Sequence, residues 1–508
     1  MLPSRLPVGE PAPQDGGRRG FSNIQAWKTG VGPPLVTFLK SSVSIVYISI
    51  FSLFLLCGCN LAPDYRKPTL PPLPATFKEA GPWTPVKPDD ATGRGAWWSV
   101  MADAGLDRLE ERIEHGSPQL AAAVARYDQA RALVRRARAE FFPEIDTTAS
   151  VQRERTLFTT AGTYYNYRDY AAGGIVSWEP DLWGRIRNLV AAARADAQAS
   201  AADLGAVRLS LEAELGEDYF QLRGLDASIS LLRKTVEAYA AALDLTTKRF
   251  TGGAANELDV GRAKTQLAST QSRLEQQVAN RALLENAIAV LIGEQPSVFS
   301  IEPSGDFPSA PVIPIMTPSH LLERRPDVAA AERHMMAANA RIGVARAAFF
   351  PNITLSATGG SATTTGALLS AGTGVWALGP ALATLAVFDG GRRFADLAVM
   401  HGQYAESAAN YQQTALNAFR EVEDQLSLLN HLADASSRQE EAVSAAERTD
   451  HLATIQYREG AVDYLQVVIA QTAELQARED MITVNTRRLV AAIDLVRALG
   501  GGWHNPTS

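Results

Sequence analysis

The chain has few of the residues that usually carry out chemistry. Its 508 residues include two cysteines and seven scattered histidines, so a cysteine–histidine metal or redox site lacks ligands. It contains no phosphate-binding loop, no G-x-S-x-G elbow and no H-E-x-x-H zinc motif. With a net charge of -7, it also lacks the basic excess of a nucleic-acid-binding protein. We therefore predict no enzyme activity, no catalytic residue, no metal, no cofactor and no nucleic-acid partner.

Proline is absent from two long intervals, one between Pro180 and Pro296 and the other between Pro380 and Pro506. Both intervals are rich in Ala, Leu, Gln, Glu and Arg, which favours long helices. In the first interval, large residues recur at alternating steps of three and four, as in a coiled coil. They are Leu225, Ile229, Leu232, Val236, Tyr239, Leu243, Thr246 and Phe250.

This spacing predicts a helix from about Arg185 to Phe250, which would be roughly 95–100 Å long at 1.5 Å per residue. Gly252 and Gly253 would end it, and a second helix over 256–291 would return antiparallel. A rod of that length is more than a compact domain needs.

The N-terminal region has the order of a secretory signal, with Lys28 and Lys40 before an apolar run over 43–56. This run is shorter than the ~20 residues that span a bilayer. The following Leu-Cys-Gly-Cys over 56–59 resembles the bacterial lipobox, which implies that Cys59 is lipidated and that Cys57 leaves with the signal. The alternative, a C-x-C metal or redox pair, lacks further ligands. By analogy with known lipoproteins, Asn60 favours outer-membrane sorting.

Residues 1–58 are thus expected to be a leader, although residues 1–35 are long for one and a later start site is an alternative. The segment 59–104 is rich in proline and is expected to run extended over a surface, as a tether that stays outside the core. A helix is predicted from Gly105 to Phe142, closed by Pro143.

Two stretches with alternating residues follow this helix. The first has Ile145 and Val151 on one face and Asp146 and Gln152 on the other, as in a strand with one apolar face. The second is predicted from Tyr167 to Trp178, where the nearby proline ends it.

The same order then returns, which indicates a tandem duplication. The sequence ARAEFFPEI at 137–145 recurs as ARAAFFPNI at 345–353, and RFTGGAANELDV recurs as QYREGAVDYLQV. We predict a first repeat over 105–300, a linker over 301–325, a second repeat over 326–501 and a tail over 502–508. The last strand, predicted over 376–388, contains Pro380, which is awkward in a central strand.

The predicted fold is a mixed α/β membrane protein, mostly α. Four strands with one apolar face must close into a barrel in lipid, yet four are fewer than the roughly eight of the smallest such barrels. Several chains must therefore combine their strands, and the long helices would continue the barrel as a tube. Such an assembly would be a channel that conducts solutes through its interior.

The chain contains the motifs GCNLAPDYRKP, EPDLWGR, LLERRPDVAAAERHMMAANARIGVARAAFFPNITL and VFDGGR, in this order. Together, in their order and spacing, they resemble the outer-membrane efflux factor family of TolC-like and OprM-like channels, in its NodT-type lipoprotein branch. The resemblance implies a homotrimer with a twelve-stranded barrel in the outer membrane and a long periplasmic helical barrel. It also implies the role of exit duct in a tripartite efflux pump, with a periplasmic adaptor and a resistance-nodulation-division transporter as partners.

Three other functions are alternatives. Type I protein secretion and metal-ion efflux lie within the same family, although the adjacent Met335 and Met336 point to different sides of a helix and support metal efflux little. A structural lipoprotein that only bridges the envelope belongs to another class, and it would not need amphipathic strand pairs.

In the family, tyrosine and aspartate contacts close the periplasmic tip of the helical barrel. Matching by repeat register implies Asp259, Tyr457, Gln466 and Ile469 as gate residues. Gln466 and Ile469 stand where relatives carry acidic residues, which implies a gate without a charged ring. The alternative is simple helix capping, by Asn256 with Asp259 and by Asp463 with Gln466.

Two further motifs have structural interpretations. Arg324-Arg325-Pro326-Asp327 is predicted to start a helix, because proline suits the first turn and aspartate its positive end. The two Phe-Phe-Pro turns at 141–143 and 349–351 are predicted to join helices to strands.

Overall fold

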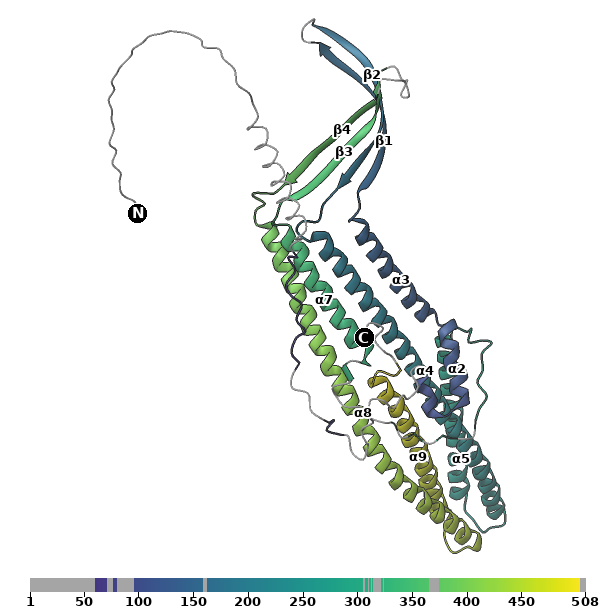
Figure 1. The fold of residues 1–508 in the computed structure, drawn as a ribbon. Coiled ribbons are helices and arrows are strands. Elements are labelled where there is room, and N and C mark those ends of the chain that lie inside the picture. Colours follow the sequence, from purple (N-terminus) through teal and green to yellow (C-terminus); the bar gives the residue numbers. More distant parts are fainter. Residues whose placement is uncertain are drawn as a thin grey trace, which may run out of the picture. The chain divides into compact units, whose positions relative to one another are not determined.

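Figure 1 shows the fold in the computed structural model, which describes residues 60–70, 76–79, 96–158, 162–304, 307–308, 310–311, 313, 321–322, 324–364 and 374–502. The description concerns the unit Gly58–Ser508. The predicted leader and Cys59 lie outside the described residues.

Two long helical hairpins dominate the structure. The first pairs α4 (Arg185–Thr251) with α5 (Glu257–Leu291), and the second pairs α8 (Arg392–Glu459) with α9 (Tyr464–Ala498). The predicted bounds of α4 and α5 are confirmed to within a residue. Asn256 caps α5 by accepting a hydrogen bond from the Asp259 amide, and Asp463 caps α9 in the same way for Gln466. The capping interpretation is therefore confirmed for both turns.

Shorter helices cover the half of each long helix that its hairpin partner does not reach. They are α3 (Pro118–Ala139), which packs on α4, and α7 (Pro326–Ala347), which lies between α4 and α8. The helices thus lie side by side in the order α3, α4, α7, α8 (Figure 1). None of the described helices is both long and apolar enough to cross a bilayer.

The main hydrophobic core lies where the middles of α4 and α8 meet the C-terminal ends of α5 and α9. The short elements η1 (Trp97–Met101) and α2 (Ala104–Gly116) contribute side chains to this core. Its most buried side chains include Leu106, Ile113, Leu215, Tyr219, Phe220, Leu222, Ile288 and Tyr411.

A four-stranded antiparallel sheet continues from the ends of α3 and α7. Its strands lie in the order β1 (Glu144–Phe158), β2 (Thr163–Trp178), β3 (Asn352–Thr363) and β4 (Gly374–Thr384). Tyr170 pairs with Thr363 and Trp178 with Leu355, so the two predicted strand pairs form one sheet. The second half of the chain thus repeats the order of elements of the first: helix, two strands, long helix, shorter helix.

Three predicted boundaries were wrong. The helix predicted over 105–142 is two helices, because Ser117 caps α3 and Pro118 occupies its first turn. The second strand begins at Thr163, four residues before Tyr167. The last strand ends at Thr384 and not at Phe388, because Thr384 faces Asn352, the first residue of β3, and later residues have no partner on that strand. Pro380 lies within β4 at an irregularity in register, where Ser356 Oγ donates to its carbonyl oxygen at 3.0 Å.

The predicted helix start at Pro326 is confirmed. Proline occupies the first turn of α7, and Asp327 is in that turn. The preceding Arg325 is buried, pairs with Asp327 at 2.7 Å and with Glu421 of α8 at 2.7 Å, and donates to the Ala498 carbonyl oxygen at 3.0 Å. This arginine therefore joins α7, α8 and α9, which is a structural role.

The N-terminal segment 60–70 runs along α7 without helix or strand. Arg346 donates to the Leu61 carbonyl oxygen at 3.3 Å, Asn339 to the Pro63 carbonyl oxygen at 2.8 Å, and Lys67 pairs with Glu332 at 2.8 Å. Successive contacts thus move from the last turn of α7 toward its start. The extended course predicted for this segment is confirmed.

The segment 76–79 then binds α8. The Glu423 carboxylate accepts from the amides of Lys78 at 2.8 Å and Glu79 at 3.0 Å, and Phe77 is buried in the main core. The prediction that the tether over 59–104 stays outside the core was therefore wrong at Phe77, and also at Trp97 and Met101 of η1, which are buried in the same core. An aromatic side chain in this proline-rich stretch has apolar area to bury, and the core receives it.

Candidate functional site

The tips of the two hairpins meet around a pair of tyrosines. Tyr457 is in the last turn of α8 and Tyr464 is the first residue of α9, with ring centres 5.3 Å apart and a tilted arrangement. Both side chains are buried, together with Ala263 of α5 and Val467 of α9. The tip cluster, as we name these four residues, therefore includes residues from both hairpins.

Tyr457 binds the first hairpin directly. The Arg249 guanidinium of α4 lies 4.5 Å from the centre of the Tyr457 ring, and one of its nitrogens donates to the Tyr457 carbonyl oxygen. The Tyr457 hydroxyl donates to Thr246 Oγ1 at 3.5 Å. A cation over an aromatic ring contributes about 0.5–2 kcal/mol, depending on how far it is desolvated. The two hairpins of one chain are thus connected through this tyrosine.

Asp259 lies beside the tip cluster and is almost fully buried. Its carboxylate is 3.5 Å from the Arg262 guanidinium, one helical turn further along α5. Burial, and then the neighbouring Tyr457, Tyr239 and Asp259, together raise the pKa of Tyr464 to about 12. Tyr464 is therefore neutral at physiological pH.

Gln466 and Ile469 lie on the surface of the single chain, whereas the other two predicted gate residues are buried. Both are exposed, and Ile469 has an exposed fraction of 54% in the single chain. Of the four, Tyr457 thus belongs to the tip cluster and Asp259 is buried beside it. Gln466 and Ile469 are free to contact a neighbouring chain.

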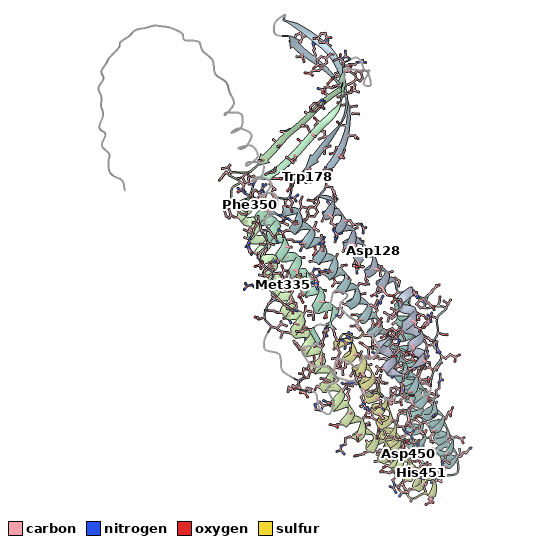
Figure 2. All side chains as sticks on the ribbon, in the orientation of Figure 1. Asp128, Trp178, Met335, Phe350, Asp450 and His451 are labelled. Atoms are coloured by element: carbon pink, nitrogen blue, oxygen red, sulfur yellow. The ribbon has the colours of Figure 1, made fainter. Side chains whose placement is uncertain are left out.

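Contacts between the hairpins continue beyond the tips. Tyr239 donates from its hydroxyl to the Gln471 carbonyl oxygen at 3.2 Å, and Arg273 of α5 forms an ion pair with Glu479 of α9. Figure 2 labels Asp450 and His451, which lie on α8 in this part of the hairpin. The hairpins are therefore joined by polar contacts that can be broken without disrupting the main core.

The register of the sheet separates an apolar face from a polar one. Directly opposite residues in antiparallel strands share a face, so the alternation can be followed across all four strands. The apolar face carries Ile145, Val151, Tyr170, Val176, Leu355, Trp376 and Leu378. The polar face carries Asp146, Thr148, Gln152, Glu154, Asp169, Ser177 and Thr358, together with the apolar Ile175, Val375 and Leu382.

The apolar face is uncovered in the single chain. Trp376 and Leu378 have exposed fractions of 79% and 83%. Large exposed apolar side chains on one face of a sheet need either a partner or lipid to cover them. The edge strands β1 and β4 also expose the backbone groups that face away from the sheet.

Aromatic side chains connect the helices to the sheet at the predicted Phe-Phe-Pro turns (Figure 2). Trp178 Nε1 donates to the Phe141 carbonyl oxygen at 3.0 Å, and Trp183 Nε1 donates to the Pro351 carbonyl oxygen at 2.8 Å. The Trp183 and Phe350 rings stack with centres 4.9 Å apart. The prediction that these turns join helices to strands is confirmed.

Two buried glutamates, Glu110 of α2 and Glu212 of α4, lie where these two helices pack together and outside the tip cluster. Both carboxylate oxygens of Glu110 lack a hydrogen-bond partner, and burial, then the nearby Glu212 and Asp107 carboxylates, raise its pKa to about 10. Burial also raises the pKa of Glu212 to about 7, although Trp97 Nε1 donates to it at 2.7 Å and opposes the shift. No group of three or more metal-ligating side chains occurs within the described ranges.

These features agree with comparisons to known proteins. The family model described as "Outer membrane efflux protein" matches the chain twice, over residues 110–294 and 317–501. The chain belongs to the outer membrane efflux protein family. It is an outer-membrane efflux protein, and the family consists of channels and not of enzymes.

Three curated relatives and one solved structure illustrate the similarity. The cation efflux system protein CusC of Escherichia coli O6:H1 is 30% identical over 452 residues, which cover 88% of this chain and 96% of CusC. Outer membrane protein OprJ of Pseudomonas aeruginosa is 32% identical over 462 residues, covering 88% and 93%. The probable outer membrane lipoprotein SilC of Salmonella typhimurium is 29% identical over 461 residues, covering 90% and 98%. The structure of the outer-membrane channel OprN matches with a TM-score of 0.81 and 31% identity, covering 88% of this chain and 100% of that chain.

The sequence did not identify Tyr464, which belongs to the tip cluster, or Arg249, which contacts Tyr457. Each nevertheless stands beside a helix end that the sequence located. An aromatic residue directly after the cap of α9 was the available signal.

Proposed function

We propose that three copies of this chain form the exit duct of a tripartite efflux system. The four-stranded sheet, with its uncovered apolar face and two unpaired edges, supports this proposal most strongly. Joining β1 of one copy to β4 of the next removes every edge and gives twelve strands with the apolar face toward lipid. The helical hairpins of the three copies then extend the barrel into the periplasm as a tube.

In this assembly the hairpin tips form the gate. The contacts of Tyr457 with Arg249 and Thr246 hold the second hairpin against the first within each chain, beside the buried Asp259. Ile469 and Gln466 would face other copies and close the pore by packing and hydrogen bonds. Opening would separate the hairpins, which is a shift between two packings of the same helices.

The duct itself is passive and draws energy from its partners. A resistance-nodulation-division transporter in the inner membrane and a periplasmic adaptor are the partners that we propose. The cargo is drugs or other small toxic compounds. The covalent lipid on Cys59 would be an auxiliary anchor, as the lipoprotein name of SilC suggests for that relative.

We retain the domain bounds drawn from the sequence as part of this proposal. They place a leader over 1–58, a tether over 59–104, repeats over 105–300 and 326–501 that arose by tandem duplication, a linker over 301–325 and a tail over 502–508.

Planar-bilayer conductance tests the proposal. The wild-type chain should form heat-resistant trimers in detergent and a pore with low resting conductance. Replacing Asp259, Tyr457 and Ile469 together by Ala should raise the resting conductance. A chain that is monomeric and does not conduct would contradict the proposed duct. A conducting trimer whose resting conductance is the same in the wild type and the triple variant would contradict only the gate assignment.

A further inference from the structure

Three arginines gather on the apolar face of the sheet at its end far from the helices. Arg153 of β1 pairs directly with Arg168 of β2, and Arg155 is two residues further along β1 on the same face. Side chains directly opposite in a sheet have Cβ atoms about 4.5–5.5 Å apart, and like charges there repel. A negative charge between the guanidinium groups would remove this repulsion.

Within the part of the chain that the structure describes, no residue supplies that charge. None of the three arginines forms an ion pair with any residue that the structure describes; Arg155 lies over the Tyr164 ring, 4.3 Å from its centre. The nearest carboxylates along the strands, Glu154 and Asp169, are on the opposite face, where Glu154 accepts from the Tyr167 hydroxyl at 2.8 Å.

A second copy of the chain does not supply the charge through its strand β4 either. The sequence from Asn352 to Phe388, which includes β3, β4 and their connection, contains no acidic residue. Whichever edge pairs with β1, the arginines meet no carboxylate from this part of the neighbour.

The arginines lie just beyond the part of the sheet in which all four strands pair. The four-stranded part of the sheet ends at the pair Tyr170 and Thr363, and Arg168 is two residues beyond it. The strands β3 and β4 have 12 and 11 residues, close to the roughly 9–11 that a tilted strand needs to span a bilayer. Figure 1 shows the β1–β2 hairpin continuing past β3 and β4.

We propose that Arg153, Arg155 and Arg168 bind phosphate groups of anionic lipids in the outer leaflet of the membrane. The inference rests on the proposed function, which directs the helices to the periplasm and this end of the sheet to the exterior. Guanidinium groups bind phosphate oxygens through two parallel hydrogen bonds, and their apolar stems can lie along lipid. One phosphate between Arg153 and Arg168 would neutralise the repulsion across the strands.

The experiment measures lipid binding to the full chain in detergent by native mass spectrometry. The probes are diphosphoryl lipid A, the same lipid with both phosphates removed, and inorganic phosphate. The test variant combines Arg153→Gln, Arg155→Gln and Arg168→Gln. A second variant carries Lys at the same positions and keeps the charge. The matched control makes the same charge change on α8, with Arg420→Gln, Arg438→Gln and Arg448→Gln, where all three side chains are exposed.

We expect diphosphoryl lipid A to bind the wild type and the α8 control equally. Its affinity should fall about fivefold for each arginine replaced by Gln, because a basic side chain near an anionic surface contributes roughly that factor. The Lys variant should stay closer to the wild type than the Gln variant. Equal binding of dephosphorylated lipid A, an equal loss in the α8 control, or inorganic phosphate binding as tightly as the lipid would each overturn the proposal.

Conductance separates this inference from the proposed function. The Gln variant should form the same pore as the wild type, because these residues are outside the gate. A conducting wild type that does not distinguish the two lipids contradicts only the lipid site. A wild type that binds diphosphoryl lipid A but never conducts contradicts only the duct.

Discussion

The Arg249 guanidinium on the first hairpin lies 4.5 Å from the centre of the Tyr457 ring on the second. Because the same arginine also donates to the Tyr457 carbonyl oxygen, one side chain holds both the ring and the backbone at the end of α8. The hairpins are therefore connected at their tips, at the end of the helices opposite the sheet (Figure 1).

Replacing Arg249 by Ala should raise the resting conductance, since it removes both contacts. Tyr457→Phe keeps the ring under the guanidinium and loses only the long hydrogen bond to Thr246, so its conductance should stay close to that of the wild type. Arg233→Ala, which removes an exposed arginine from the same helix, is the matched control. Equal conductance in the Arg249 and Arg233 variants would show that the tip contact does not close the pore.

The buried glutamates predict that stability falls as the pH rises. The pKa values of Glu110 and Glu212 in the folded chain, about 10 and about 7, exceed the ordinary 4.5, so above pH 4.5 the folded state holds more protons than the unfolded state. The stabilisation of the folded state by each neutral carboxyl group is fully present below pH 4.5. It decreases as the pH rises, until about pH 7 for Glu212 and until about pH 10 for Glu110. Between these limits the free energy of unfolding falls by up to roughly 1.4 kcal/mol per pH unit for each proton.

Glu110→Gln should therefore flatten this decline, because the amide imitates the neutral carboxyl group. Thermal unfolding followed by circular dichroism from pH 5 to pH 8 measures it, and the variant should be more stable than the wild type at pH 8. Glu111→Gln, at the exposed neighbouring position, should keep the wild-type slope. Parallel slopes for the two variants would mean that Glu110 does not hold a proton.

The hydrogen bonds of Glu423 to Lys78 and Glu79 predict an effect on proteolysis. Glu423→Ala leaves both amides without their acceptor, so the segment 76–79 should detach from α8 more often and be cleaved faster by a protease at limiting concentration. Asp424→Ala is the control, because that exposed carboxylate is 4.0 Å from Arg420 and does not contact the segment. Unchanged cleavage in the Glu423 variant would mean that Phe77 alone holds the segment.

The turn into α8 predicts opposite effects for two glycines. Gly391 has a φ of 88° with open space around it, so Gly391→Ala should cost about 1–2 kcal/mol through backbone strain alone. Gly402 lies inside α8, also in open space, and Gly402→Ala should stabilise the helix by up to about 1 kcal/mol. Thermal midpoints that move in the same direction for both variants would contradict this account.

The parts of the fold that depend on local physics were predictable from the sequence. The ends of α4 and α5 follow from Gly252 and from the Asn256 cap, and the alternation of β1 gave its two faces. The break at Ser117 was missed because the surrounding composition favours helix throughout, although Ser followed by Pro is a helix start signal.

The parts that depend on rotation and register between elements were not predictable. Asp259 and Tyr457 both lie near Tyr464 only because the two hairpins present particular sides to each other, and heptad spacing does not determine which turn faces which. Arg249 and Tyr464 escaped prediction for the same reason. The end of β4 depends on where β3 begins, which is a property of the pair and not of either strand.

The hydrogen bond between Arg346 and the Leu61 carbonyl oxygen limits how far a lipid anchor could reach. Only Asn60 separates Leu61 from Cys59, and two residues extend at most about 7 Å. A lipid on Cys59 would thus be held near the last turn of α7, just before the turn into β3, and not at the end of a free chain. The end of α7 would then determine both the depth of the acyl chains in the bilayer and the depth of the sheet. Inserting residues between 59 and 61 should therefore allow the two depths to vary independently.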